Sequence, residues 1–322
     1  QVQHAAPNPH GSLPPVVLAE TAGGYTGLSG RIASTVEASS RADGSISLAF
    51  DNLAGRPTVL ESTDNGATWQ GTDILSRIGL DNAQTEVVTW TDPNSGQTFG
   101  AVVSDFNLYI FSQDANGNWG ATNLNEEANV PADQTPLASL TAFVGPNDRA
   151  RIVGINRAGE TVIFIQQPDS GSPDANAPTW LFINLNDNLE SRGLAAPEFV
   201  SDLTTYVTTW GQTTIAGLDS SGDIQTIWTV PSIQNWNTTN LSAITNAPRF
   251  VGAITPFLTT WGGINIAGMT SEGSLEAVWW VPQFGGDWRT VDLTESFNTP
   301  WGGLTVAGVR ADSAPGQGEL VA

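Results

Sequence analysis

Trp69-Gln-Gly-Thr-Asp73-Ile74 is the first copy of a six-residue pattern that decides the fold. The pattern is a tryptophan, three further residues, an asparagine or aspartate, and then a leucine or isoleucine. Its other copies begin at Trp119, Trp180, Trp236 and Trp288, with spacings of 50, 61, 56 and 52 residues between successive tryptophans. A period of this size indicates a supersecondary unit repeated along the chain.

Two neighbouring units align most closely, because residues 199–217 match residues 250–268 at a constant offset of 51. The later unit contains four segments with the β-branched and aromatic content of strands, namely 254–261, 264–270, 275–281 and 288–293. A turn with glycine, Ser271–Ser274, separates the second from the third. Equivalent turns are expected at 219–223, 156–160 and 104–107. The last has Asn107 instead of glycine, and both residue types tolerate the positive φ that tight hairpins need. No segment has the apolar spacing of a helix.

The third strand of each unit is apolar on both faces, as Leu275–Val281 and Val162–Ile165 show. A sheet with one face in water would alternate instead. We therefore expect sheets that stack face against face. Four short antiparallel strands every fifty residues describe an all-β fold, a β-propeller of four-stranded blades.

The repeats predict one propeller domain over residues 31–322, preceded by a tail over residues 1–30. Blade-like repeats are expected at about 31–80, 81–132, 133–196, 197–247 and 248–298, with a partial repeat at 299–322 that begins at Trp301. Residues 15–20 could supply the missing outer strand and close six blades, since closure removes an exposed sheet edge. Alternatively, the chain is part of a longer array.

One repeat carries a recognisable turn motif. Ser62-Thr-Asp-Asn-Gly-Ala-Thr-Trp69 fits Ser-x-Asp-x-Gly-x-Thr-Trp and resembles the Asp-box of bacterial sialidases and other secreted propellers. Ser112–Trp119 is a degenerate copy. The later units resemble the blades of bacterial propeller lectins. In those families the aspartate accepts hydrogen bonds from its turn and the tryptophan packs between sheets, so the resemblance implies structural anchors rather than catalytic groups: Asp64, Trp69, Trp119, Trp180, Trp236 and Trp288.

Composition limits the partners. The net charge is -21, all 11 basic residues are arginine, and charged residues make up only 13% of the chain, about half the usual share. We expect no nucleic-acid partner and no insertion into a membrane, since phosphates and anionic lipids are bound through basic patches. The absence of cysteine excludes disulfides and thiolate metal sites, and the first residue, Gln1, fits a removed leader. An extracellular or cell-surface location, bacterial by the resemblance, is therefore expected.

Catalytic sets are hard to assemble from this sequence. Both histidines, His4 and His10, lie in the tail, so the folded body has no Ser-His-Asp triad. The arginine signature of sialidases is absent, with Arg31-Ile-Ala33 the nearest match, and Tyr109 and Tyr206 lie in apolar strands where core positions are expected. Paired carboxylates for glycoside hydrolysis remain open, because their pairing is spatial.

Two kinds of binding remain as hypotheses. Trp90, Trp210, Trp261 and Trp301 occupy equivalent places at or just after the first strand of their units, where they would either stack on sugar rings or belong to the core. No cofactor is expected, although oxygen-rich turns at 92–96, 114–117 and 219–223 leave calcium open. The leading interpretation is a non-catalytic binding or assembly module for a glycan or a protein partner. The alternative is a propeller glycoside hydrolase.

Overall fold

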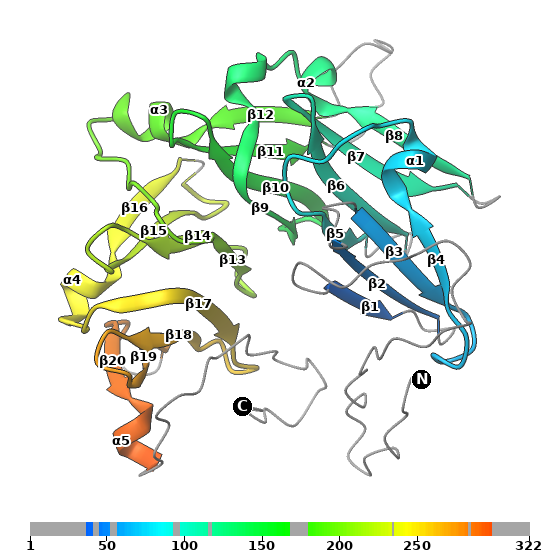
Figure 1. Cartoon of the computed structure of the whole chain (residues 1–322). Helices are drawn as coiled ribbons and strands as arrows, with labels where there is room; N and C mark the ends of the chain where they lie inside the picture. The colour runs from blue at the N-terminus through cyan, green and yellow to red at the C-terminus, as the bar shows by residue number, and fades with distance from the viewer. Residues whose placement is uncertain are drawn as a thin grey trace. The chain divides into compact units, whose positions relative to one another are not determined.

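The computed structural model describes residues 37–40, 45–51, 57–92, 97–114, 118–167, 180–233, 235–282 and 285–297. Within these residues, twenty strands form five four-stranded antiparallel sheets, and each sheet follows the order of the sequence. They are sheet 1 (β1 Glu37–Ser40, β2 Ile46–Asp51, β3 Pro57–Ser62, β4 Gln70–Asp73), sheet 2 (β5 Val88–Thr91, β6 Thr98–Ser104, β7 Asn107–Gln113, β8 Trp119–Asn123), sheet 3 (β9 Pro136–Gly145, β10 Arg149–Asn156, β11 Thr161–Gln166, β12 Trp180–Asn184), sheet 4 (β13 Thr204–Val207, β14 Thr213–Leu218, β15 Ile224–Thr229, β16 Asn237–Asn240) and sheet 5 (β17 Phe250–Leu258, β18 Ile264–Thr270, β19 Leu275–Trp280, β20 Arg289–Asp292) (Figure 1).

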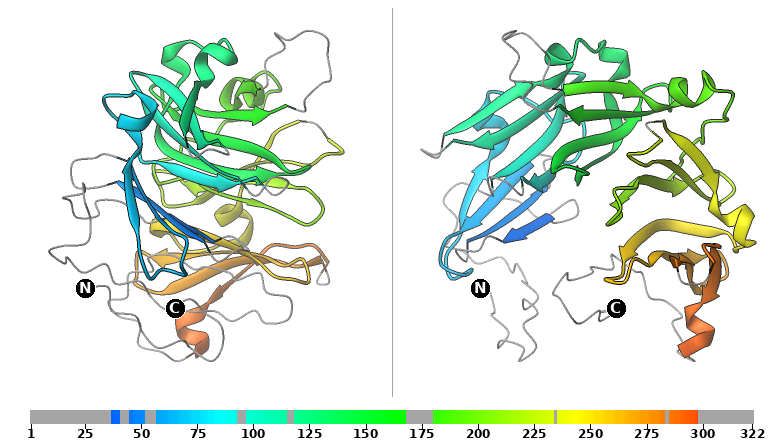
Figure 2. Two further views of the ribbon diagram at one scale, coloured as in Figure 1. Left: turned by 90° about the vertical axis from the view of Figure 1, so that its right-hand side faces the viewer. Right: turned by 180° about the vertical axis from the view of Figure 1, so that it is seen from behind.

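The chain divides into two compact units, residues 1–74 and residues 75–322. The first contains sheet 1, and the second contains sheets 2 to 5. Within the second unit, successive sheets follow one another face to face (Figure 2). The architecture is therefore all-β and built from the four-stranded antiparallel blades of a β-propeller, as the repeats predict. The proposed closing strand at 15–20 and the partial repeat at 299–322 lie outside the described residues.

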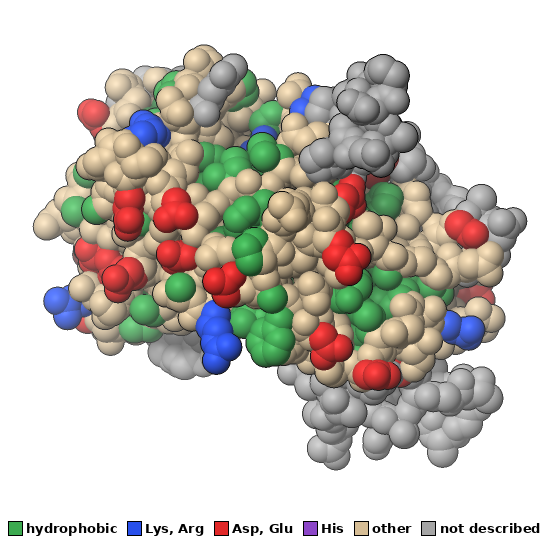
Figure 3. Space-filling model, turned by 90° about the horizontal axis from the view of Figure 1, so that it is seen from above, with side chains coloured by type: hydrophobic (Ala, Val, Ile, Leu, Met, Phe, Trp, Pro, Cys, Tyr) green, Lys and Arg blue, Asp and Glu red, His purple; other side chains and the backbone are tan. Residues whose placement is uncertain are grey.

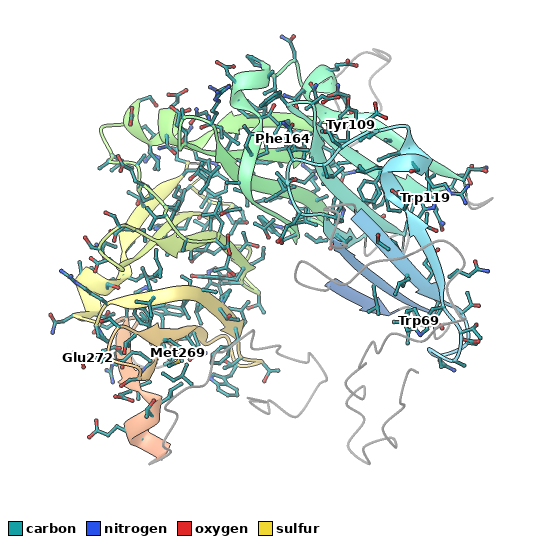
Figure 4. The ribbon with its side chains drawn as sticks, viewed as in Figure 1. Trp69, Tyr109, Trp119, Phe164, Met269 and Glu272 are labelled. Atoms are coloured by element: carbon teal, nitrogen blue, oxygen red, sulfur yellow. The ribbon has the colours of Figure 1, made fainter. Side chains whose placement is uncertain are left out.

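The core of the second unit lies between neighbouring sheets, and single strands contribute to two cores at once. On β10, Ile152 packs between sheets 2 and 3, while the next residue, Val153, packs between sheets 3 and 4. On β11, Phe164 and Ile163 divide in the same way, and Figure 4 marks Phe164 within its sheet. This confirms the prediction that the third strands are covered on both faces.

Short helices correct the expectation that the chain has none. They follow the fourth strands and span α1 (Ile74–Ile78), α2 (Leu124–Glu127), α3 (Leu185–Glu190), α4 (Leu241–Thr245) and α5 (Leu293–Phe297), with a 3₁₀ turn η1 at Ala132–Gln134. The fourth strand of sheet 5 therefore ends at Asp292, one residue before the predicted Leu293. Each of these helices is about one turn long, too short for its apolar residues to show a helical period.

The asparagine of the repeated pattern caps these helices. Asn184 accepts hydrogen bonds from the amides of Asn186 and Asp187, and Asn240 accepts one from the amide of Ala243. Asn123 does the same for α2. The leucine that follows each cap is buried, with 0% exposure at Leu185. The pattern thus ends a strand, starts a helix and places an apolar anchor, which is N-cap chemistry.

A second device ties each helix back to its own sheet. Two residues after the cap, a polar side chain accepts a hydrogen bond from the first or second amide of the third strand. The bonds run from Leu108 to Asn125 (2.8 Å), Thr161 to Asn186 (2.9 Å), Ile224 to Ser242 (2.9 Å) and Leu275 to Thr294 (2.8 Å). Sheets 2 to 5 therefore share one helix lock, built from three different residue types that all offer an oxygen.

The turns between the second and third strands follow the prediction in three of four cases. Gly159, Gly222 and Gly273 have φ between +81° and +85°. In sheet 2, positive φ falls on Asp105 and Phe106 rather than on Asn107, which corrects the sequence interpretation. Asn107 instead donates its side-chain amide to the Asp105 carbonyl.

The described helices are all too short to cross a membrane. Figure 3 shows acidic side chains spread over the face seen from above, with few arginines among them and much uncharged surface between them.

Candidate functional site

The four tryptophans nominated from the sequence have different environments. Trp90 lies on β5, is only 7% exposed and stacks on Phe99 with 5.5 Å between ring centroids. Trp210 and Trp261 are 41% and 62% exposed. Trp301 lies outside the described residues. Of the three described tryptophans, therefore, only Trp90 is a core residue.

A tight turn presents Trp210 to solvent. Two hydrogen bonds between Thr208 and Gln212, of 2.9 Å and 3.0 Å, close this turn. More specifically, the Thr208 amide donates to the Gln212 carbonyl, and the Gln212 amide donates to the Thr208 hydroxyl. Gly211 supplies the φ of +85° that the turn requires. The sequence Thr-Thr-Trp-Gly thus forces the tryptophan to the tip, and the same turn closes around Trp261.

Trp210 lies at a cavity of about 190 Å³ between sheets 4 and 5. We call this cavity the tryptophan pocket. Sheet 4 and the start of α4 contribute Tyr206, Trp210, Gln212, Thr214, Thr226, Trp228, Thr239 and Leu241, and sheet 5 contributes Ile264, Trp280 and Trp288. Four of these eleven described lining residues are tryptophan, and none of the eleven carries a formal charge at neutral pH.

Hydrogen bonds fix the lining. Trp228 donates its indole N–H to the Thr239 hydroxyl at 3.0 Å, and the Thr226 hydroxyl donates to the Thr239 carbonyl at 3.0 Å. Across the interface, Trp210 and Trp280 are tilted by 52°, with 5.4 Å between ring centroids. The pocket therefore has aromatic walls, with threonine hydroxyl groups among its lining residues.

Tyr206 closes one side of the pocket and is 7% exposed. Burial raises the pKa of its phenol to about 12, so the phenol stays protonated at neutral pH. Burial also raises the pKa of Tyr109, the other described tyrosine. Neither environment favours the ionised oxygen that a tyrosine nucleophile would need.

Sequence reasoning missed Trp228 and Trp280 and assigned Trp288 a purely structural role. The pocket joins two sheets, so Trp228 and Trp280 come from third strands of different repeats and line one cavity only because the sheets stack. One signal was present: Ile224–Thr229 and Leu275–Trp280 each carry tryptophan near the strand end, where the other third strands have none.

Two further cavities lie between neighbouring sheets, with different linings. One of about 390 Å³ between sheets 2 and 3 includes Trp90, Asp92, Asp148, Arg149 and Trp180. Another of about 270 Å³ lies between sheets 3 and 4, and Arg151 is the single charged residue of its described lining. The three interfaces thus offer different chemistry, although their strands are equivalent.

The proposed repeat anchors occupy turns and interfaces. Trp180 and Trp236 are 4% and 5% exposed and belong to the cores between sheets. Trp69, Trp119 and Trp288 are half-buried, and Figure 4 places the first two at the β3–β4 and β7–β8 ends of their sheets. The Trp69 indole donates to the Gly66 carbonyl at 3.1 Å.

Asp64 organises the β3–β4 turn. It accepts bonds from the Thr68 amide (2.8 Å), the Thr68 hydroxyl (2.6 Å) and the Ser62 hydroxyl (2.8 Å). The Thr68 side chain and amide are the main causes that lower the pKa of Asp64 to about 2. In the next sheet, Asp114 accepts from both the amide and the side chain of Asn118, so asparagine takes the place of threonine in the degenerate copy.

Among the described residues, no group of three acidic or histidine side chains lies close enough together to hold a metal ion. The described calcium candidate, the turn at 219–223, uses its carboxylate internally: Asp219 accepts from the Ser221 and Asp223 amides and from the Gln225 side chain. The other two turns, at 92–96 and 114–117, lie partly outside the described residues, as do His4, His10, Tyr25 and Arg31.

Comparison with known proteins gives structural likeness without sequence likeness. No family model matches the chain, and no curated protein matches it in sequence. A protein of unknown function from Dyadobacter fermentans superposes with a TM-score of 0.50 at 12% identity, covering 81% of this chain and 83% of its own. A mutant of AofleA from Arthrobotrys oligospora gives 0.50 at 12% identity, covering 80% and 72%. The SapL1 lectin in complex with α-methyl fucoside gives 0.49 at 14%, covering 81% of each chain. At such identities the likeness concerns the fold.

Proposed function

We propose that this chain is a secreted or cell-surface β-propeller module that binds carbohydrate without catalysing a reaction. The tryptophan pocket is the site, and its ligand is one uncharged sugar ring. The lining carries this proposal, because its described residues combine four tryptophans with threonine hydroxyls and a glutamine amide and include no charged group.

This lining complements a sugar on both of its surfaces. A pyranose has apolar C–H faces that pack on aromatic rings, and its edges carry hydroxyl groups that need hydrogen-bond partners. The side-chain amide of Gln212 donates to the Thr214 hydroxyl at 3.0 Å, and this bond orients it along the pocket wall. The volume of about 190 Å³ lies below the roughly 300 Å³ at which pockets for drug-sized ligands begin, and it suits a single ring.

The test is a binding measurement on the full chain with a matched pair of variants. Trp210→Ala removes one wall of the pocket, and we expect at least a tenfold loss of affinity for the sugar that binds best on a glycan array. Trp261→Ala removes the tryptophan at the same turn position of the next sheet, which does not line the pocket, and should leave that affinity unchanged. Fucosides, such as the ligand in the SapL1 structure, are the first sugars to include.

Equal losses in both variants would point to a general surface effect, and no binding across the array would remove the proposal. The glycoside hydrolase alternative makes a different prediction. It requires paired carboxylates. The described lining of the tryptophan pocket contains none, whereas Asp92 and Asp148 line the cavity between sheets 2 and 3. Turnover of chromogenic glycosides that Asp148→Asn abolishes would favour that alternative.

A further inference from the structure

The cavity between sheets 3 and 4 is built around one arginine. We call it the arginine pocket, lined by Pro146, Asn147, Arg151, Gly211, Thr213, Thr229, Val230 and Pro231. Arg151 is half-buried on β10 and reaches across the interface to sheet 4, where its Nη1 donates to the Thr213 hydroxyl at 2.6 Å. Its guanidinium is therefore held in a fixed position.

The neighbouring strand is shaped to accept this side chain. A Cβ atom at Gly145 would lie only 2.3 Å from Nε of Arg151, so the guanidinium rests where any other residue would clash. Nε is buried there and has no hydrogen-bond partner among the described residues. A buried donor without a partner is costly, and a positive charge increases that cost.

The charge of Arg151 also lacks a partner within the part of the chain that the structure describes. No described carboxylate pairs with it, although the chain has 32 acidic residues. Burial and the like charge of Arg149 lower its pKa to about 10, so it remains protonated at neutral pH. Arginine is rarely buried in folded proteins unless it is paired, and Arg151 is partly buried.

We propose that the arginine pocket binds a small oxyanion, a carboxylate or a sulfate group, on the guanidinium of Arg151. The planar guanidinium matches such groups geometrically. The Thr213 hydroxyl accepts from Nη1, so its own proton is free to point to the ligand, and Thr229 adds a second hydroxyl to the lining. The volume of about 270 Å³ exceeds that of the tryptophan pocket and leaves room for a group attached to the anion, such as a sugar acid. This site lies at a different interface and is independent of the proposed binding of neutral sugars.

Calorimetric titration of the full chain at constant ionic strength tests the proposal with three probes. We expect sodium glucuronate or sodium sulfate to bind, and methyl glucoside not to compete with either. Glucuronate binding identifies a carboxylate ligand, and binding of sulfate alone identifies a sulfate ligand. Arg151→Gln should weaken binding of the anion at least tenfold.

The matched control is Arg157→Gln, which removes the same charge from an exposed turn at the other end of β10. It should leave anion binding within twofold of wild type. Equal affinity in wild type and Arg151→Gln, an equal loss in the control, or absence of heat with both anions would overturn the proposal. If Arg151→Gln does not fold, Thr213→Val keeps the charge and removes its anchor; unchanged affinity in that variant would overturn the proposal as well.

Discussion

Replacement of Asn125 by alanine tests the helix lock, the bond that joins each short helix to its own sheet. Asn125 is 3% exposed, and its side chain makes three hydrogen bonds. It accepts from the Leu108 amide (2.8 Å) and donates to the Thr135 hydroxyl (2.7 Å) and the Val130 carbonyl (3.3 Å). At a net value of about 1 kcal/mol for each bond, Asn125→Ala should lower the free energy of unfolding by about 3 kcal/mol.

The equivalent residue of sheet 3 gives a graded comparison. Asn186 is half-buried and, in the same lock, accepts only from the Thr161 amide at 2.9 Å. Asn186→Ala should therefore cost about 1 kcal/mol. Asn186→Ser should recover part of that loss, because sheet 4 uses Ser242 at the same place.

Urea unfolding followed by tryptophan fluorescence gives these free energies, and hydrogen exchange of the Leu108 amide reports the lock directly. We expect exchange at Leu108 to accelerate in Asn125→Ala well before global unfolding. If both alanine variants lie within about 0.5 kcal/mol of wild type, the range of ordinary surface changes, then the lock does not contribute to stability and our reasoning is wrong.

Three further predictions concern packing and protonation. Gly217→Ala should destabilise by about 1–3 kcal/mol, because its Cβ would lie 2.6 Å from the Phe199 ring, while Gly268→Ala, with nearest atoms at 3.0 Å, should cost less; thermal denaturation of the pair decides this. The pKa of Asp64 in the folded protein is lowered to about 2, so its stabilising contribution is present above its ordinary pKa near 4 and is lost as the pH falls toward 2. The difference in melting temperature between wild type and Asp64→Ala should therefore shrink over that interval, and a constant difference would contradict the prediction. The pKa of Tyr206 is raised to about 12, so its contribution to stability is present below pH 10 and is lost as the pH rises through 12. In an alkaline absorbance titration of the protein, Tyr206→Phe should remove the phenol step near pH 12.

The repeat was readable because each strand carries its own pattern of apolar residues and each glycine turn marks a hairpin. The short helices were not, since one turn of helix contains too few residues for a period of 3.6 to show. A cap signal was nevertheless present: asparagine or aspartate before a leucine or isoleucine at 73, 123, 184, 240 and 292 is an N-cap followed by an apolar anchor.

The pockets could be predicted only in part. The sequence nominated Trp210 from its place in a turn, and that residue lines a cavity. It could not bring Trp228 and Trp280 together, because their faces depend on strand register in two different sheets. Nor could it show that no described carboxylate pairs with Arg151, because ion pairing depends on which residues the stacked neighbour presents.

The division of single strands between two cores has a consequence for how the second unit unfolds. Ile152 and Val153 are adjacent in sequence, yet each supports a different pair of sheets. Energetic coupling should therefore pass between nearest neighbours, as in a one-dimensional array. A cavity made at Phe164 would destabilise the packing between sheets 2 and 3 directly. It would affect sheet 5 only after sheet 4 had unfolded. Proteolytic cleavage of such variants should accordingly spread outward from the damaged interface, one sheet at a time.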